Sequence, residues 1–249
     1  MTSDWLRKIR VDDWQHFKKM VSDIGDRGLE DHCVEDLIFR GQPLGSFSLS
    51  ASLDRENSAL NIGRRNELQD RILRQFQRRN PGLAVGRDPL ELLGLLQHNG
   101  CPTRVLDWSS SPYVAAFFAL SDTLRYDSDE EHCAVWALWR EAPPLAAGAG
   151  IGVLEPSFAG NERSKAQRGL FTTNNSLSPT LVEFINDWDR GHPLGGTVLW
   201  QYLIPRKAAV GARRDLALMG IDHESLFPDT TGAARAAYFA ALEREATTS

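Results

Sequence analysis

The chain has 249 residues, of which 42% are hydrophobic, 24% charged and 9% aromatic, values typical of a globular protein with one large domain or two small ones. Its formal net charge of −5 argues against general adhesion to DNA or to an acidic membrane surface, so any anion binding must be local. Only five of the 28 basic residues are lysine. An arginine excess favours bidentate recognition of phosphate or carboxylate, although GC-rich coding produces the same bias.

The sequence carries no membrane, export or metal signal. No segment approaches the roughly 18 apolar residues that span a bilayer, and the N-terminus lacks a basic region followed by an apolar one. We therefore expect a cytoplasmic protein without a membrane partner. Cys33, Cys101 and Cys133 lie far apart and without Cys-x-x-Cys spacing, so we expect three thiols and no metal site.

The first part of the chain predicts two helices with a short strand between them. Apolar residues recur at helical spacing over 12–24, after two aspartates that favour a helix start. A buried strand is expected at 37–42, where Gly41 permits a tight turn or a close backbone approach. Arginines surround much of the helix expected at 66–79. A solvated charged face is its default interpretation, and a nucleic-acid contact is the alternative.

The central part predicts a helix, a strand and a second helix in close succession. The apolar helix at 90–96 is followed by Gly100, a residue type that ends helices. A strand-like run occupies 103–108. Three serines and Pro112 then form a helix start, and the apolar residues at 113–120 predict a buried helix.

The second half alternates strands and helices at irregular spacing. Strands are expected at 134–139, 169–173 and 197–205, helices at 180–188, 206–219 and 232–245, and a Pro/Gly/Ala-rich surface loop at 142–152. The irregular alternation favours an α+β fold over a doubly wound parallel sheet. Because no long linker divides the chain, we expect a single domain over 1–249, with its core motifs within 37–205 and helices over 206–245.

Several polar residues lie at expected strand ends and helix caps, where chemistry that needs fixed geometry is often placed. No standard phosphate-loop, dinucleotide-binding, serine-hydrolase or zinc-protease motif covers them. These candidates are Arg40, Gln42, Gln97, His98, Thr103, Arg104, Asp107, Arg163 and Gln167.

Two nucleophile arrangements are conceivable in this region, and both have little support. Cys101 with His98 could form a nucleophile and its base, but a thiol three residues from a histidine at a helix end is more often incidental. Ser109, His98 and Asp107 supply the residue types of a catalytic triad without an oxyanion-loop signature.

Three motifs resemble the FRG domain family, which is named for its Phe-Arg-Gly. They are Phe39-Arg40-Gly41-Gln42, the run Gln-His-Asn-Gly-Cys-Pro-Thr-Arg-Val-Leu-Asp-Trp at 97–108, and Ser111-Pro112 followed by Ala-Ala-Phe-Phe-Ala at 115–119. The similarity continues at Arg163, Gln167, Gly169 and Phe171, then at 220–221 and 226–229, and so covers most of the chain. Cys101 stands where the family usually has another small or apolar residue, which further weakens a cysteine mechanism.

The layout of these motifs is similar to the ADP-ribosyltransferase fold, with a first strand ending in Arg-Gly, a strand running into a serine-rich turn, and a late apolar strand ending in proline. The resemblance implies a split mixed sheet flanked by helices, NAD as substrate and no metal. It also implies that Arg40 grips the phosphates of NAD, that the serines at 109–111 support the site, and that Gln201 occupies the position of the usual catalytic glutamate.

Cleavage of the nicotinamide–ribose bond leaves positive charge on the sugar, so such a site needs a phosphate grip, a polar acceptor near the ribose and shelter from water. Gln201 has no negative charge and could equally be an ordinary strand residue. Carboxylates are available at 107, 155, 162 and 183. Asp107 is favoured because it lies in the densest polar motif, and its alternative role is as a partner of a helix N-terminus or of Arg104.

The remaining polar candidates also have two interpretations each. His98 could bind substrate or act as a general base, or it could be a capping or buried hydrogen-bonded histidine. Arg163 and Gln167 could contact phosphate or the acceptor, or form a surface salt link.

The leading hypothesis is a cytoplasmic enzyme that transfers ADP-ribose from NAD to RNA, DNA or protein, or that hydrolyses NAD. By the resemblance it would be a toxin or an anti-phage effector, which could have a neutralising antitoxin. The alternative is a non-catalytic module that binds a nucleotide or phosphate. In the enzyme hypothesis the catalytic candidates are Asp107, His98 and Gln201, and NAD is bound by Arg40, Gly41, Gln42, Gln97, Thr103, Arg104, Ser109, Arg163 and Gln167.

Overall fold

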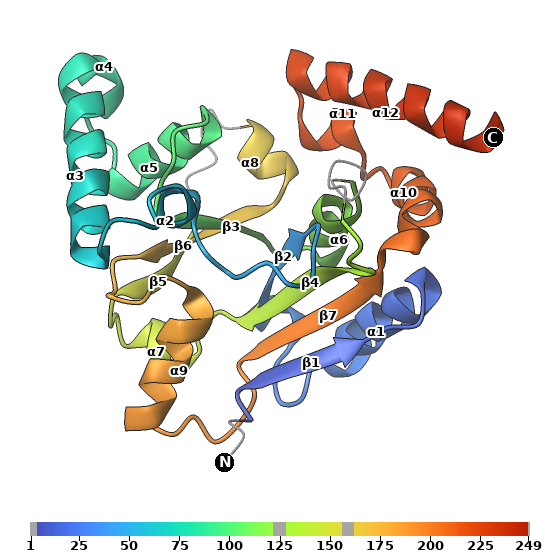
Figure 1. The fold of residues 1–249 in the computed structure, drawn as a ribbon, viewed down its shortest axis with the longest axis horizontal. Coiled ribbons are helices and arrows are strands. Elements are labelled where there is room, and N and C mark those ends of the chain that lie inside the picture. The colour runs from blue at the N-terminus through green and yellow to red at the C-terminus, as the bar shows by residue number, and fades with distance from the viewer. Residues whose placement is uncertain (1–3, 122–127, 156–161, 249) are drawn as a thin grey trace.

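A seven-stranded mixed sheet forms the centre of the computed structural model, which describes residues 4–121, 128–155 and 162–248 (Figure 1). The strands are β1 (Leu6–Arg10), β2 (Leu37–Gln42), β3 (Val105–Ser109), β4 (His132–Trp139), β5 (Ile151–Leu154), β6 (Gly169–Asn174) and β7 (Leu199–Pro205). Their order is β1-β7-β4-β2-β3-β6-β5, with β1 and β7 parallel and the other neighbours antiparallel. This arrangement confirms the expected α+β class.

Helices flank the sheet. They are α1 (Trp14–Arg27), α2 (Ser52–Glu56), α3 (Ile62–Arg79), α4 (Pro81–Ala84), α5 (Pro89–His98), α6 (Pro112–Ser121), α7 (Pro143–Ala146), α8 (Glu162–Ala166), α9 (Leu181–Gly191), α10 (Ala209–Leu218), α11 (His223–Leu226) and α12 (Thr230–Thr248), with 3-10 turns η1 (Val34–Asp36) and η3 (Arg206–Ala208). None of the described helices is long and apolar enough to cross a membrane.

The central strands carry apolar side chains on both faces because helices cover both. Phe39, Val135 and Trp200 belong to the core beneath α1, α6 and α10. Trp136 and Leu199 point to the opposite face and share a second core with α7 and α9. Strands that are buried on both faces are apolar throughout rather than alternating.

Each helix and strand expected from the sequence is present to within a few residues, but the expected surface loop at 142–152 is wrong. That segment contains α7 and the start of β5, and Leu145 is buried in the core beside α9. Pro143 stands at the first helical position, where its missing N–H costs no hydrogen bond. Long-range packing of this apolar residue therefore overrides the loop-like composition.

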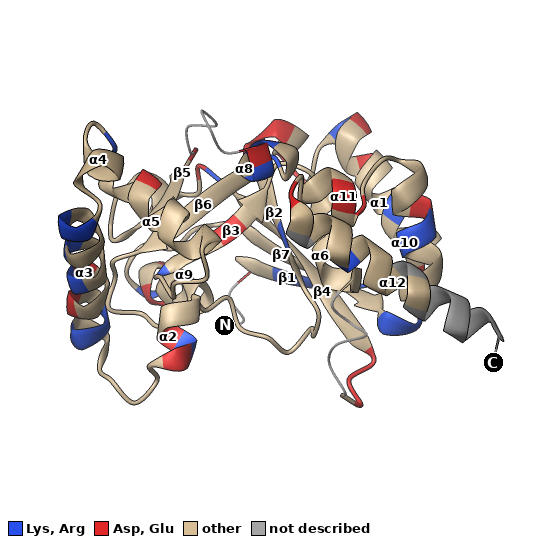
Figure 2. Ribbon diagram, turned by 90° about the horizontal axis from the view of Figure 1, so that it is seen from above, with Lys and Arg blue, Asp and Glu red and all other residues tan. Residues whose placement is uncertain are grey.

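The arginine-rich helix α3 packs its apolar side against α5 and carries its charges outward. Leu73 and Phe76 join a small core with Leu93 of α5 and Val105 of β3. Basic residues are distributed along the outer side of α3 (Figure 2). Arg65 is the exception, because its guanidinium is buried and bonds to the carbonyls of Leu60 and Ser58.

Gly41 allows α6 to pack directly on β2. A Cβ atom at this position would lie 1.9 Å from the carbonyl oxygen of Ala115 and 2.6 Å from the amide nitrogen of Ala119. Both clashing atoms belong to the backbone of α6, so a rotamer change cannot relieve the contact. The glycine in the Phe-Arg-Gly motif is therefore required by packing.

We expect Gly41→Ala to destabilise the protein by about 1–3 kcal/mol or more, because the helix and strand must separate to admit the methyl group. Urea denaturation followed by circular dichroism measures the change in the free energy of unfolding. Gly152→Ala is the matched control, since no atom lies within 4 Å of its added Cβ. Equal effects of the two substitutions would contradict the close approach of α6.

Candidate functional site

A cavity of about 490 Å³ opens where β2 and β3 diverge. The two strands share the single registered pair Phe39–Ser109, whereas the pairing of β2 with β4 continues to Gln42. The end of β2 therefore separates from β3 and leaves space between them. Residues from β2, β3, β6, α5, α6, α8 and the segment 43–55 line this space.

Arg40 lies at the point of divergence with its guanidinium in the cavity wall. Its Nη1 donates a 2.6 Å hydrogen bond to the backbone carbonyl of Asp107 and lies 3.9 Å from the carboxylate of the same residue. Its buried Nε has no hydrogen-bond partner among the described residues. Burial lowers the pKa of Arg40, an effect that Asp107 opposes and Arg55 reinforces. A largely desolvated guanidinium that lines a cavity is suited to an anionic ligand.

A hydrogen-bonded chain orients the Asp107 carboxylate. The Thr103 hydroxyl donates to Gln97 Oε1 at 2.6 Å, and Gln97 Nε2 donates to Asp107 Oδ2 at 2.5 Å. The donating Thr103 hydroxyl requires an acceptor and so faces the amide oxygen of Gln97. The amide nitrogen of Gln97 is thereby turned toward Asp107. The Asp107 side chain remains 58% exposed and thus accessible from the cavity.

The end of α5 brings Gln97 and His98 to the cavity. Gly100 has a φ of +80° and follows the helix, where its amide bonds to the Gln97 carbonyl, as expected for a helix-ending glycine. Burial lowers the pKa of His98 from 6.5, Arg163 adds to this effect, and Asp229 and Asp107 oppose it. The imidazole is therefore neutral at neutral pH and able both to accept and to donate a hydrogen bond.

The opposite wall is formed by α8 and the turn that follows it. Ser109 Oγ donates to the Gln167 carbonyl at 2.7 Å, and Gln167 Nε2 donates to the Leu226 carbonyl at 3.1 Å. The Arg163 guanidinium stacks on Phe227, with its Cζ 4.4 Å from the ring centroid. These contacts connect β3, α8 and α11 in one wall.

The cavity is cationic and partly aromatic. Arg40, Arg55 and Arg163 line it, while Asp107 is the single carboxylate among the described lining residues. Arg55, which sequence reasoning missed, lies in a polar segment without a motif and donates to the carbonyl of Ser50. Flat apolar surfaces are supplied by Phe47 and Phe171, together with Phe39, Trp108 and Phe118. This composition suits a ligand that combines anionic groups with planar rings.

Of the sequence-predicted site residues, nine line the cavity: Arg40, Gly41, Gln42, Gln97, His98, Asp107, Ser109, Arg163 and Gln167. Gln42 is already engaged, because it donates to the Ser48 carbonyl and accepts from the Trp136 indole. Thr103 lies behind the wall and reaches the cavity only through Gln97.

The structure does not place Arg104 or Gln201 at the cavity, contrary to expectation. The Arg104 side chain is 0% exposed and pairs with Asp54, so it cannot reach a ligand. Gln201 is buried in β7 and pairs with Trp136 of β4, which pairs with Arg40 of β2. Gln201 and Arg40 are therefore two strand spacings apart, roughly 10 Å. The Gln201 amide donates to the Gly45 carbonyl at 2.7 Å and so supports the segment after β2.

The fold and site together define an α+β protein with a cationic, partly aromatic cavity. The family model of the FRG domain matches residues 35–128, which include Arg40, the Gln97–Trp108 run and α6. This match confirms the resemblance to the FRG domain that the motifs indicate. Comparisons with curated proteins and with solved structures return no significant match.

We expect Thr103→Val to release the Gln97 amide, because its partly buried oxygen loses its hydrogen-bond donor. The expected cost is about 0.5–1.5 kcal/mol in the free energy of unfolding. Hydrogen exchange of the Gln97 side-chain amide, followed by NMR, reports the release directly. Thr103→Ser keeps the hydroxyl and is expected to retain slow exchange. If the amide stays protected in Thr103→Val, the hydroxyl does not orient it.

Proposed function

We propose that the chain is an NAD-dependent ADP-ribosyltransferase, which cleaves the nicotinamide–ribose bond and transfers ADP-ribose to a macromolecule. The observation that carries this proposal is the meeting of the Arg40 guanidinium and the Asp107 carboxylate in one cavity between two diverging strands. The similarity in the order of motifs to ADP-ribosyltransferases supports NAD as the substrate.

In this proposal Arg40 binds the pyrophosphate of NAD through its planar donor fork. The partial burial of its side chain supports the role, since a desolvated cation gains most from an incoming anion. Arg55 lies near enough to influence the pKa of Arg40 and adds positive charge to the same end of the cavity. Phe47 and Phe171 offer surfaces on which an adenine or nicotinamide ring can pack.

Asp107 takes the role of the catalytic carboxylate in this proposal. Breaking the glycosidic bond leaves an oxocarbenium-like sugar, which a fixed negative charge stabilises. The bond from Gln97 holds the carboxylate in place before the reaction, so little reorganisation is needed. Gln201 is uncharged and engaged with Gly45, which favours Asp107 for this role. Neutral His98 is suited to accept a proton from an acceptor hydroxyl.

The acceptor in this proposal is RNA, DNA or protein, and water as acceptor would make the enzyme an NAD glycohydrolase. A role as a toxin or anti-phage effector, with an antitoxin as its partner, follows from the family resemblance alone. The competing proposal is a module that binds a nucleotide without turnover, which the lack of a carboxylate at position 201 favours.

We expect Asp107→Asn to lower kcat by about 10²–10³-fold with little change in NAD affinity, because the charge matters mainly in the transition state. Arg40→Gln is expected to weaken NAD binding as well. Nicotinamide release from labelled NAD, with and without candidate acceptors, measures turnover, and calorimetry measures affinity. Asp26→Asn, at an exposed position on α1, is the matched control.

Full turnover by Asp107→Asn would refute the catalytic assignment of this residue. Thermal stabilisation by NAD without nicotinamide release, under all acceptor conditions, would favour the binding module instead.

A further inference from the structure

We propose that the α8 side of the cavity is a second anion site, formed by Arg163, Arg235 and His98, which binds the terminal phosphate of a nucleic-acid acceptor. This inference rests on the proposed function in one respect, namely that the bound strand end accepts ADP-ribose. The binding itself follows from the placement of the basic groups and can be tested without NAD.

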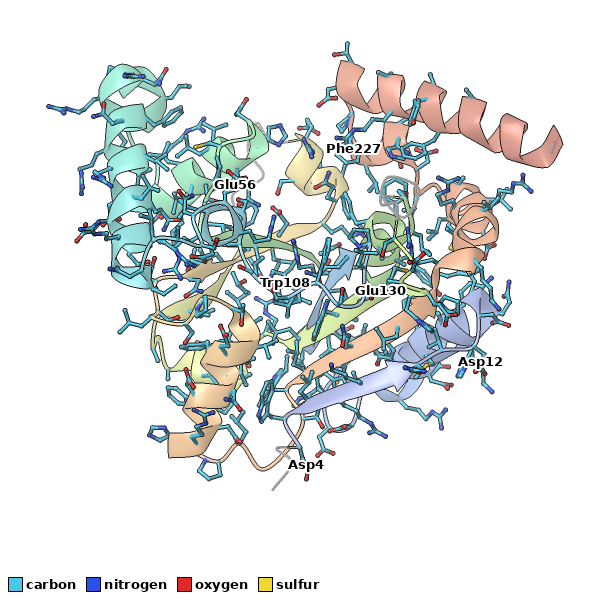
Figure 3. All side chains as sticks on the ribbon, viewed as in Figure 1. Asp4, Asp12, Glu56, Trp108, Glu130 and Phe227 are labelled. Atoms are coloured by element: carbon cyan, nitrogen blue, oxygen red, sulfur yellow. The ribbon has the colours of Figure 1, made fainter. Side chains whose placement is uncertain are left out.

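The two arginines of this site are held by the same aromatic ring. Phe227 is 2% exposed and lies between α8 and α12, with Arg163 Cζ 4.4 Å and Arg235 Cζ 5.3 Å from its centroid (Figure 3). A cation over a ring face gains energy without using its N–H donors. Both guanidinium groups are therefore fixed in position while donors remain for a ligand.

Arginines outnumber carboxylates among the described residues in and beside the cavity. Burial lowers the pKa of Arg163, Asp107 and Asp229 oppose that shift, and Arg235 reinforces it. Among the described residues, four arginines, at positions 40, 55, 163 and 235, thus stand against two carboxylates, Asp107 and Asp229, and Asp107 acts on Arg40, Arg163 and His98 alike. A dianionic phosphate would complement these groups, and the neutral imidazole could donate one further hydrogen bond.

The cavity has more basic groups than one pyrophosphate requires. Arg40 and Arg55 lie at the end formed by β2 and the segment after it, and Arg163 lies on α8 across the cavity. Asp107 interacts electrostatically with both Arg40 and Arg163, which places the catalytic candidate between the two ends. This arrangement suits a donor bound at one end and an acceptor phosphate at the other.

A strand of nucleic acid fits the α8 side better than an isolated phosphate on a protein. Arg163 lines the cavity, whereas Arg235 belongs to α12 and is not among the cavity-lining residues. The basic groups therefore continue from inside the cavity to its outside. A terminal phosphate in the cavity and the next phosphodiester outside it would use both arginines.

Transfer of ADP-ribose to a terminal phosphate requires no added base. One oxygen of the terminal phosphate attacks C1′ of the nicotinamide-bearing ribose and forms a C–O bond. The C1′–N bond breaks, its electron pair goes to the ring nitrogen, and nicotinamide leaves as a neutral molecule. A phosphate dianion carries no proton on the attacking oxygen. When phosphate is the acceptor, His98 therefore only needs to position the phosphate and not to remove a proton.

The test uses one oligonucleotide in three forms, with a 5′-phosphate, a 3′-phosphate or hydroxyl ends only, and a phosphopeptide for comparison. Fluorescence anisotropy with the full chain, in the absence of NAD, gives each Kd at fixed salt. We expect one phosphorylated form to bind at least about tenfold more tightly than the hydroxyl form, in line with a charge-assisted contact. Arg163→Gln should abolish this preference. Arg214→Gln, at an exposed position on α10, should retain it.

With labelled NAD, the expected product is an oligonucleotide whose terminal phosphate is resistant to phosphatase. Equal affinity of all three forms, or a preference that survives in Arg163→Gln, would overturn the second anion site. Phosphopeptide binding as tight as that of the strand would overturn its assignment to nucleic acid. An Arg163-dependent preference without NAD turnover would refute the proposed enzyme while leaving the anion site intact.

Discussion

The buried charge of Arg104 is the interaction on which one wall of the cavity depends. Its guanidinium donates to both Asp54 carboxylate oxygens, at 2.9 and 3.0 Å, and to the carbonyls of Ser176 and Ser178 at 3.2 Å. A charge in the protein interior is tolerated only when its donors are satisfied, and removing one partner of such a pair typically costs about 3–5 kcal/mol. The start of β3 is thereby fixed to α2 and to the segment after β6.

The second wall is anchored by a different kind of contact. Gly41 places β2 directly against α6, with no side chain between strand and helix. Arg40 immediately precedes Gly41 in β2 and projects to the other face, so its position is determined by the packing of its neighbour. The cavity therefore lies between a wall held by a buried ion pair and a wall held by backbone packing. Their divergence after the Phe39–Ser109 pair creates the space that a ligand could occupy.

Local patterns predicted most of the fold because the helices and central strands have the periodicity and capping residues of their class. Pro112 and Gly100 mark helix ends that the structure has. Strand β1 could not be predicted in this way, since it is an edge strand with three exposed basic residues and is paired with β7, far along the chain. Such pairing depends on contacts that no local window contains.

The same limit explains which of the expected site residues lie at the cavity. Arg40, Gln97 and Asp107 lie in motifs whose spacing keeps them together, and the cavity unites them. Arg104 has the same polar character, yet its partner Asp54 lies 50 residues earlier in a segment without a pattern. The sequence shows that the motif is polar but not which residue faces inward.

The many arginines of the chain fall into groups with different surroundings. The other arginines of α3 lie in solvent, whereas Arg65 and Arg104 are buried and bond to backbone carbonyls and to Asp54. Arg40, Arg55 and Arg163 instead converge on a cavity with one carboxylate among its described lining residues. In a chain of net charge −5, the lining of this cavity is a local reversal of sign. In the proposed function, anion binding depends on the shape of the gap between β2 and β3, so weakening either wall should reduce binding without removing any charge from the cavity.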